Sequence, residues 1–303
     1  MDELIRVAAF QWLDKQVANH GGILPRNLLE QGFQYQGLRV TLVGASGIWK
    51  PRVMELPISL TTILEGPYND YVAHDYNLYY RYRGTDVNHW NNVLARKAMK
   101  KKVPLIYILG VEPNKYIVEW PVYIIDERPD LVEPYFIVSL SDHAQFKKLI
   151  HDQLDDQMIL EFPVEYTNEY ARREALFRLH QGEFRVRVLT AYNEQCAFCR
   201  LRHQQLLDAA HIIPDNEGGE PIVPNGLSLC KIHHAAYDNN IVGVNPDYRI
   251  IVRDDILEEI DGPMLKYGIQ EMHGQKIYLP NKPDNRPGQE RLAYRFERFL
   301  KAV

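Results

Sequence analysis

Cysteine is scarce in this chain of 303 residues, and its three cysteines all fall between positions 196 and 230. Three thiols cannot pair into disulfides without a remainder, so we expect a reducing, cytoplasmic environment rather than a disulfide-stapled secreted fold. Long apolar runs are also missing, since no stretch approaches the roughly 18 residues that a membrane-spanning helix needs. The first residues are acidic and amphipathic, which is not the pattern of a signal peptide. The sequence therefore predicts a cytoplasmic protein without membrane contact.

A strong excess of either charge is absent too, because the net charge is −5. That total does not indicate a nucleic-acid partner, but the charge is uneven. Residues 96–102 carry five positive charges and no acid, arginines gather between 172 and 202, and acids gather in 152–169. Local patches rather than the total decide phosphate binding. Each basic patch is equally compatible with a solvated helix face.

The length predicts two domains, since single cores rarely grow much beyond roughly 250 residues. Residues 1–142 read as mixed α and β, and residues 143–167 as a helical, acidic linker. Residues 168–303 form the second predicted domain. The fold class that follows is α+β, with a curved sheet in the first domain.

Periodicity places the elements of both domains. Helices are predicted at 4–19, 25–31, 89–102, 142–159, 168–192 and 288–301. Strands are predicted at 33–43 with a break at Gly37, and at 76–84, 103–111, 116–125, 135–140 and 248–253.

The cysteines have metal-ligand spacing. A Cys196-x-x-Cys199 pair is followed by Cys230-x-x-His233, which is the usual layout of a closed tetrahedral zinc site. The strand–turn–strand–helix unit predicted here has almost no core and needs a metal staple. We therefore predict structural Zn²⁺ on these four residues, with independent buried thiols as the alternative.

Three polar residues in the same stretch are left over: His211, Asn225 and His234. Alternation in LLDAAHII predicts a short strand with Leu207, Ala209, His211 and Ile213 on one face. HHAAYD reads as a helix start, which places His234 and Asp238 four residues apart on one helical face.

The segments DAAHIIP, PNGLSLC and HHAAYD resemble the His-Asn-His signature of the HNH, or ββα-metal, endonuclease superfamily. This resemblance implies a zinc-stapled nuclease domain in which His211 is the general base that activates water against a phosphodiester. It implies that Asn225 holds the loop and orients His211 by a hydrogen bond. His234 would bind the catalytic Mg²⁺ or Mn²⁺, with Asp238 as a candidate second ligand.

The chain departs from that signature at one position. Many relatives carry a metal-binding Asp or His immediately before the general base, and this chain has Ala210 there. Asp208 is a candidate substitute ligand, and a salt bridge that supports the fold is an equal alternative. The constellation as a whole is also compatible with a purely structural zinc knuckle or with an inactive HNH domain.

Aromatic, arginine and basic residues gather in the first domain and predict contacts with double-stranded DNA. The residues predicted to contact a base are Tyr80, Arg81, Tyr82, Arg83, His89, Trp90 and Asn92, and those predicted to contact phosphates include Lys100 and Lys101. Lys50 and Arg52 lie on a turn that is another candidate DNA-contact loop or plain structure. The alternative is that the tyrosines are inward strand residues and the lysines a solvated helix face.

The run YRYRG faintly resembles the SRA (YDG) family of modified-cytosine readers, which are related to PUA domains. That resemblance implies a modification-dependent restriction enzyme. One HNH site cuts one strand, so a homodimer is expected. The alternatives are a sequence-specific restriction nuclease that needs no modification, and a zinc-stabilised DNA-binding regulator without activity.

Overall fold

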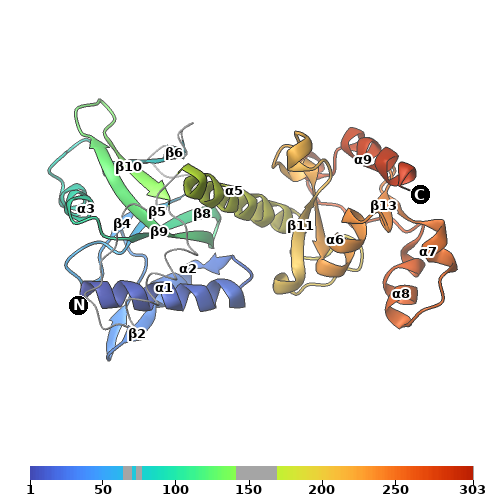
Figure 1. The fold of residues 1–303 in the computed structure, drawn as a ribbon, viewed down its shortest axis with the longest axis horizontal. Helices are drawn as coiled ribbons and strands as arrows, with labels where there is room; N and C mark the ends of the chain where they lie inside the picture. Colours follow the sequence, from blue (N-terminus) through green and yellow to red (C-terminus); the bar gives the residue numbers. More distant parts are fainter. Residues whose placement is uncertain (64–69, 73–76, 141–168, 303) are drawn as a thin grey trace. The chain divides into compact units, whose positions relative to one another are not determined.

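The computed structural model describes residues 1–63, 70–72, 77–140 and 169–302. The chain forms two compact units, unit 1 (Met1–Gly182) and unit 2 (Glu183–Val303). The division lies inside helix α5 (Glu169–Ala191), labelled in Figure 1. The predicted linker at 143–167 and helix at 142–159 lie outside the described residues. The predicted domain limits, 1–142 and 168–303, stay a prediction.

Unit 1 is built on one mixed sheet. Among the described residues, eight strands form it in the order β4-β5-β8-β9-β10-β7-β6, with β1 also paired to β9. Only the β5–β8 pair is parallel. The strands are β1 (Leu24–Pro25), β4 (Ile48–Trp49), β5 (Ser59–Thr62), β6 (Tyr71–Val72), β7 (Leu78–Arg81), β8 (Leu105–Glu112), β9 (Lys115–Arg128) and β10 (Tyr135–Leu140).

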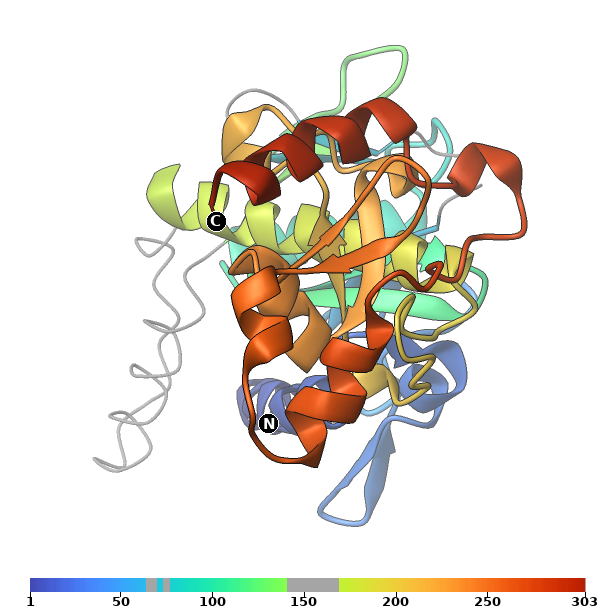
Figure 2. The same cartoon turned by 90° about the vertical axis from the view of Figure 1, so that its right-hand side faces the viewer.

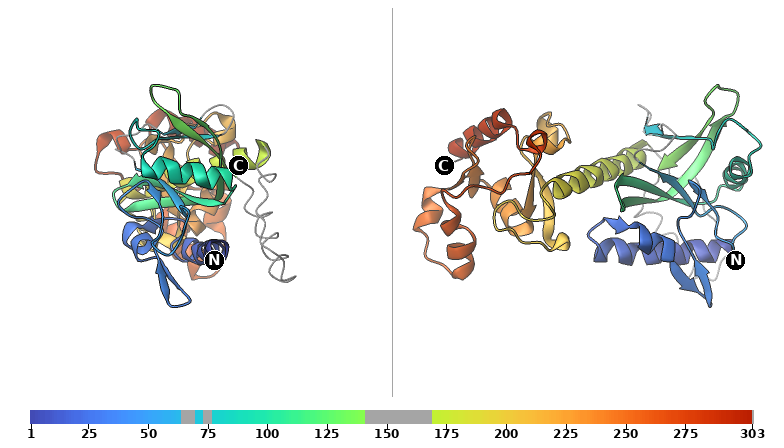
Figure 3. Two further views of the ribbon diagram at one scale, coloured as in Figure 1. Left: turned by 90° about the vertical axis from the view of Figure 1, so that its left-hand side faces the viewer. Right: turned by 180° about the vertical axis from the view of Figure 1, so that it is seen from behind.

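The sheet is curved because the pairing register of its long central strands, β8 and β9, shifts along their length. The β8–β9 register shifts between Leu105 and Tyr107 and again between Gly110 and Glu112, and such irregularities bend a strand and increase its twist. Figure 3 shows the bent sheet from behind. The predicted α+β class with a curved sheet is confirmed.

Helix α1 (Asp2–Asn19) supplies the core on one side of this sheet. Its apolar stripe buries Ile5, Phe10 and Leu13 in one cluster with Ile106 of β8 and Trp120 of β9. Burial of such a stripe, rather than helix propensity, is the main source of helix stability in proteins.

Shorter elements complete unit 1. Helices α2 (Arg26–Gln31) and α3 (Trp90–Lys100) match predicted helices. Strands β2 (Phe33–Tyr35) and β3 (Leu38–Val40) form a hairpin that turns at Gly37, whose φ of +79° favours glycine. The predicted break at that glycine is confirmed.

Unit 2 contains a strand–strand–helix arrangement. Strands β11 (Leu207–His211) and β12 (Gly226–Cys230) pair antiparallel. Helix α6 (Lys231–Asp238) begins directly after β12 and packs on both strands. The carboxy-terminal part of α5 covers the hairpin, and Phe184 and Val188 share one buried cluster with Leu227 and Leu229. This is the arrangement expected of a ββα unit.

The rest of unit 2 surrounds a second hairpin of β13 (Val242–Val244) and β14 (Ile250–Val252), and helix α9 (Gln289–Lys301) packs on β13 (Figure 2). Helices α7 (Asp254–Glu258) and α8 (Pro263–Gly268) follow β14. Across the described ranges, none of the helices combines the length and apolar character of a bilayer-crossing segment.

Candidate active site and metal centre

Four metal-binding side chains converge at the start of α6. The ligand atoms of Cys196, Cys199, Cys230 and His233 all lie within 4.8 Å of one another. The Sγ atoms of Cys199 and Cys230 are 4.0 Å apart, and His233 Nδ1 is 3.2 Å from Cys230 Sγ. A tetrahedral zinc ion with about 2.3 Å bonds to sulfur and about 2.0 Å to nitrogen implies ligand separations of roughly 3.8 and 3.5 Å. The four predicted ligands therefore fit a zinc ion.

The histidine of this cluster is oriented by a second bond. Nε2 of His233 lies 2.8 Å from the carbonyl oxygen of Gly268, so it donates there and turns Nδ1 toward the thiols. A backbone acceptor of this kind fixes the tautomer of a metal-binding histidine. Because Gly268 ends α8, the cluster ties α6 and the Cys196–Cys199 knuckle to a distant part of unit 2.

His211 is the last residue of β11, and its backbone pairs with Gly226. Its imidazole stacks on the ring of Phe184 from α5, with centroids 4.1 Å apart and planes 20° apart. Nε2 is buried and has no hydrogen-bond partner among the described residues. Burial lowers the pKa of His211, against the opposing charge of Asp215. The imidazole is therefore neutral at neutral pH, and one of its two nitrogens can accept a proton.

Asn225 holds the loop that follows His211. The side chain is 0% exposed; its Oδ1 accepts from Ile213 N at 2.9 Å. Its Nδ2 donates to the carbonyl oxygens of Ile213 and Glu220, both at 3.0 Å. The predicted loop-holding geometry is present. The prediction that Asn225 hydrogen-bonds to the His211 imidazole is wrong, because the amide of Asn225 bonds to backbone groups of the loop instead.

The loop also needs a glycine at position 219. A Cβ there would lie 1.8 Å from the carbonyl oxygen of Ile213 and 2.9 Å from Nδ2 of Asn225. Only glycine lets the backbone come this close to the asparagine that holds the loop.

His234 lies on α6 with a carboxylate at each ring nitrogen. Nδ1 is 4.0 Å from Asp208 Oδ2, and Nε2 is 3.2 Å from Asp238 Oδ2. The nearby carboxylate of Asp208 raises the pKa of His234, and burial opposes this. Asp208 is in turn held by Arg185 of α5, at 3.3 Å between Oδ1 and Nε. The structure thus brings the predicted ligands together and also shows the salt bridge that was the alternative for Asp208.

The side chain of Ala210 is fully buried in the core of unit 2 and offers no metal ligand. Because β11 covers Leu207–His211, its alternation places Leu207, Ala209 and His211 on one face, and Ile213 lies beyond the strand.

Residues 196–245 match the family model described as HNH endonuclease. This segment is an HNH nuclease module. The match covers the cysteine cluster, His211, Asn225 and His234. No curated protein matches the chain.

Two solved structures are similar to parts of the chain that extend beyond the HNH module. One is described as "Modification dependent TagI restriction endonuclease", with 14% identity, a TM-score of 0.30, and coverage of 80% of this chain and 81% of that one. The other is "the Type IV phosphorothioation-dependent restriction endonuclease ScoMcrA", with 16% identity, a TM-score of 0.24, and coverage of 59% of this chain and 49% of that one. None of these comparisons shows the SRA or PUA resemblance.

Of the residues predicted to contact DNA outside the HNH module, some are buried and others are exposed. Tyr82 is 1% exposed, stacks on Phe136 and is hydrogen-bonded to Glu127. Asn92 is also buried, and its amide bonds the backbone of Arg83 and Asp86. The prediction that these two side chains contact DNA is therefore wrong, because both are buried and hydrogen-bonded inside unit 1.

Several more of the predicted contacts already have structural partners. Lys50 Nζ donates to the carbonyl oxygen of Met54 at 2.8 Å, and His89 Nδ1 caps α3 by accepting from Asn91 N. Arg81 is paired with Glu133. The predicted residues that remain exposed are Arg52, Arg83, Trp90, Lys100 and Lys101.

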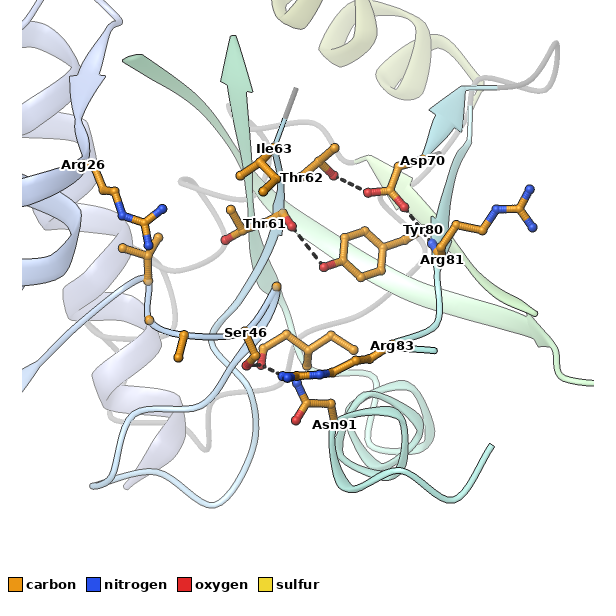
Figure 4. Close-up of a pocket in the computed structure, with 15 residues that line it drawn as sticks. Arg26, Ser46, Thr61, Thr62, Ile63, Asp70, Tyr80, Arg81, Arg83 and Asn91 are labelled. Carbon is orange, nitrogen blue, oxygen red and sulfur yellow. Dashed lines mark hydrogen bonds between the residues drawn. The ribbon is translucent and has the colours of Figure 1, made fainter. Parts of the chain in front are cut away.

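Tyr80 and Arg83 lead to a cavity of about 320 Å³ in unit 1 (Figure 4). It lies between the 43–48 loop, the end of β5 and β7. Asp70 lines it, bonded at 2.6 Å to Thr62 Oγ1 and at 2.7 Å to Arg81 N. Burial raises the pKa of Asp70, and the bond from Thr62 opposes this.

Two polar atoms at this cavity call for attention. Asn91 Oδ1 and Thr61 Oγ1 are buried and have no hydrogen-bond partner in the described chain. Buried polar atoms are paired in the great majority of cases, so an unpaired one calls for an explanation such as a ligand or water. A cavity of this volume with a few convergent polar groups has the character of a small-ligand site.

Sequence reasoning missed Phe184 and Arg185 as parts of the HNH site and Asp70, Thr61 and Asn91 as parts of the cavity. Phe184 belongs to a helical stripe that predicts only core packing. An arginine one residue later gave no signal, because its partner Asp208 is distant in sequence.

Proposed function

We propose that the chain is a metal-dependent DNA endonuclease in which His211 is the general base. The observation that supports this most is the position of His211 at the end of β11, where its half-buried imidazole stacks on Phe184 and has a lowered pKa. A neutral imidazole accepts a proton from water at working pH. His211 lies on β11, and His234 and Asp238 lie on helix α6, which packs on that strand.

The donors around His234 fit a hard divalent ion such as Mg²⁺ or Mn²⁺. Because Asp208 and Asp238 lie at different ring nitrogens, only one of them can share an ion with His234. Asp238 is the better candidate, since it is exposed, whereas Asp208 is already paired with Arg185. Asp208, whose Oδ2 lies 4.0 Å from Nδ1, then orients the ring by its negative charge, as outer-shell carboxylates do. When bound, the ion stabilises charge that develops on the phosphate and the leaving oxygen.

The cavity of unit 1 supports recognition of a single base, and with it a modification-dependent, type IV-like enzyme. Reading a base in a pocket requires that the base leave the stack, where its edge meets hydrogen-bonding groups. Asp70, Thr61 and Asn91 are polar residues that line this cavity of about 320 Å³. The exposed Arg52, Lys100 and Lys101 are proposed to contact phosphates. A homodimer is proposed because one HNH site cuts one strand.

A digestion panel tests the proposed function. One plasmid is prepared unmodified, cytosine-methylated and hydroxymethylated, and each form is incubated with and without EDTA. The expected result is cleavage of modified DNA alone, lost with the chelator. Equal cleavage of the unmodified plasmid would favour the sequence-specific restriction nuclease. Nicking of no substrate with added Mg²⁺ or Mn²⁺ would favour the zinc-stabilised regulator.

One substitution tests the proposed role of the cavity directly. Thr61→Val keeps the shape of the side chain and removes a hydroxyl that bonds to nothing in the described chain. Its folding stability should therefore be unchanged or higher, while its affinity for modified duplex falls about 10-fold. Arg52→Ala changes an exposed residue outside the cavity lining. It should weaken the binding of modified and unmodified duplex equally.

A further inference from the structure

The imidazole of His211, the proposed general base, must be held in one orientation, and Asn225, which was predicted to orient it, does not bond to it. The amide of Asn225 is spent on Ile213 and Glu220. Nε2 of His211 has no hydrogen-bond partner among the described residues. The ring contact that the structure does show is the parallel stack on Phe184, at 4.1 Å and 20°.

Phe184 is fixed where it meets His211. It is 1% exposed and lies in the core of unit 2 with Val188 and Leu227. A buried ring of this kind has few accessible rotamers, since close packing around it leaves no space to turn. The face that it offers His211 is therefore a rigid one.

The opposite strand leaves room for this ring. Gly226 pairs with His211 across the hairpin. A Cβ at Gly226 would lie 2.9 Å from Cζ of Phe184 and 2.5 Å from Cγ2 of Val188. Any larger residue would push the phenyl ring away from its place, so Gly226 is a second, independent feature that keeps Phe184 against His211.

The next residue of α5 holds the other end of the same strand. Nη2 of Arg185 donates to the carbonyl oxygens of Gln204 and Leu207, at 3.0 and 2.8 Å, and its Nε faces Asp208. Phe184 at the end of β11 and Arg185 at its start therefore fix the strand that carries the base.

We propose that Phe184 is a positioning residue for the reaction assigned to His211: its ring fixes the plane of the half-buried imidazole and with it the direction from which the imidazole accepts the proton. This rests on the proposed function, since it concerns the same base. General-base catalysis depends on geometry before basicity. A base that is free to tilt loses catalysed rate while the binding of DNA elsewhere is unaffected.

The test compares two core variants of α5. Phe184→Leu keeps an apolar side chain and removes the flat ring, and Leu189→Ala is the matched control, because Leu189 is a fully buried residue of the same helix and core. Both should be less stable than wild type and still folded. Phe184→Leu should lower kcat on saturating DNA by roughly 10- to 100-fold with little change in KM, while Leu189→Ala should not. A kcat for Phe184→Leu within about twofold of wild type would overturn the proposal, as would an equal loss in Leu189→Ala.

A second measurement does not depend on activity. In NMR spectra of the full chain, the ring protons of His211, assigned by their loss in His211→Ala, should be shifted upfield by the stacked phenyl ring. The shift should vanish in Phe184→Leu and persist in Leu189→Ala. Unshifted His211 protons in the wild type would overturn the proposal whatever the nuclease assay shows. A wild type that shows the shift and cuts no DNA would contradict the proposed function and, with it, the role of Phe184.

Discussion

Oδ2 of Asp208 on β11 lies 4.0 Å from Nδ1 of His234 on α6. The two residues come from different elements of the ββα unit, and the second carboxylate near this ring, Asp238, lies at Nε2. A histidine with an acceptor at one nitrogen presents the other to a metal in a defined direction. This relationship separates the roles of the two carboxylates and can be tested with one variant of each.

Asp238→Ala should weaken the catalytic metal site more than Asp208→Asn does. The first variant removes a proposed ligand, so the Mn²⁺ concentration that gives half-maximal cleavage should rise. The second removes the negative charge beside Nδ1 of His234 and should lower cleavage at saturating Mn²⁺ about 10- to 100-fold. Cleavage rates over a Mn²⁺ titration check both. The reverse pattern, with Asp208→Asn raising the metal requirement and Asp238→Ala leaving it unchanged, would make Asp208 the ligand.

The pH dependence of cleavage follows from His211. A general base must be deprotonated to act, and burial holds the pKa of His211 below its usual value, which is about 6.5 for a free histidine. The rate at saturating metal should therefore stay high down to a pH below about 6.5 and fall only as the depressed pKa is passed. Single-turnover rates between pH 5 and 8 measure this. A fall that begins above pH 7 would contradict the account of the His211 environment.

Asn225→Ala should destabilise unit 2. It leaves the N–H and C=O of Ile213 without partners, and each unsatisfied buried group costs about 1–3 kcal/mol. Urea unfolding should show a loss of about that size. Asn225→Asp is a second variant, since it keeps an acceptor for the N–H of Ile213 but replaces the two donated bonds with a buried carboxylate oxygen beside the carbonyl oxygens of Ile213 and Glu220. Its loss should be at least as large as that of Asn225→Ala. Equal stability of Asn225→Ala and wild type would show that the loop does not depend on this side chain.

Zinc should be bound at one ion per chain and should be needed for folding of unit 2. Cys230→Ala removes one of four ligands whose atoms lie within 4.8 Å of one another. Structural zinc sites of this kind contribute folding free energy outright. The expected result is loss of zinc by atomic emission together with a lower melting temperature, while Asp238→Ala retains the ion. Full zinc occupancy in Cys230→Ala would assign the ion to different ligands.

The HNH module could be predicted in detail because its chemistry is local in sequence. The spacing of Cys196-x-x-Cys199 and Cys230-x-x-His233 specifies the zinc site, and the resemblance to HNH endonucleases implies the second site at the adjacent His234. The helices and longer strands of unit 1 were likewise predictable, because the apolar run of β8 and the stripe of α1 reflect burial on the sheet. The short strands β1, β4, β5 and β6 were not predicted.

Relationships between distant elements could not be predicted from the sequence. Arg185 meets Asp208 and Phe184 meets His211 only because α5 packs on the β11–β12 hairpin. Tyr82 carries the same sequence signal as an exposed aromatic residue, and its burial under Phe136 is decided by the pairing of β7 with β10. Burial, and therefore availability for DNA, is a property of tertiary packing rather than of composition.

The most direct test of the central claim is His211→Ala in a single-turnover cleavage assay on modified plasmid, with zinc content and DNA affinity measured on the same preparation. Knocking out a general base typically costs about 10²- to 10⁴-fold in rate. The expected result is loss of cleavage of at least that order, with one zinc per chain and wild-type DNA affinity retained. Undiminished nicking by a folded His211→Ala protein would contradict the account.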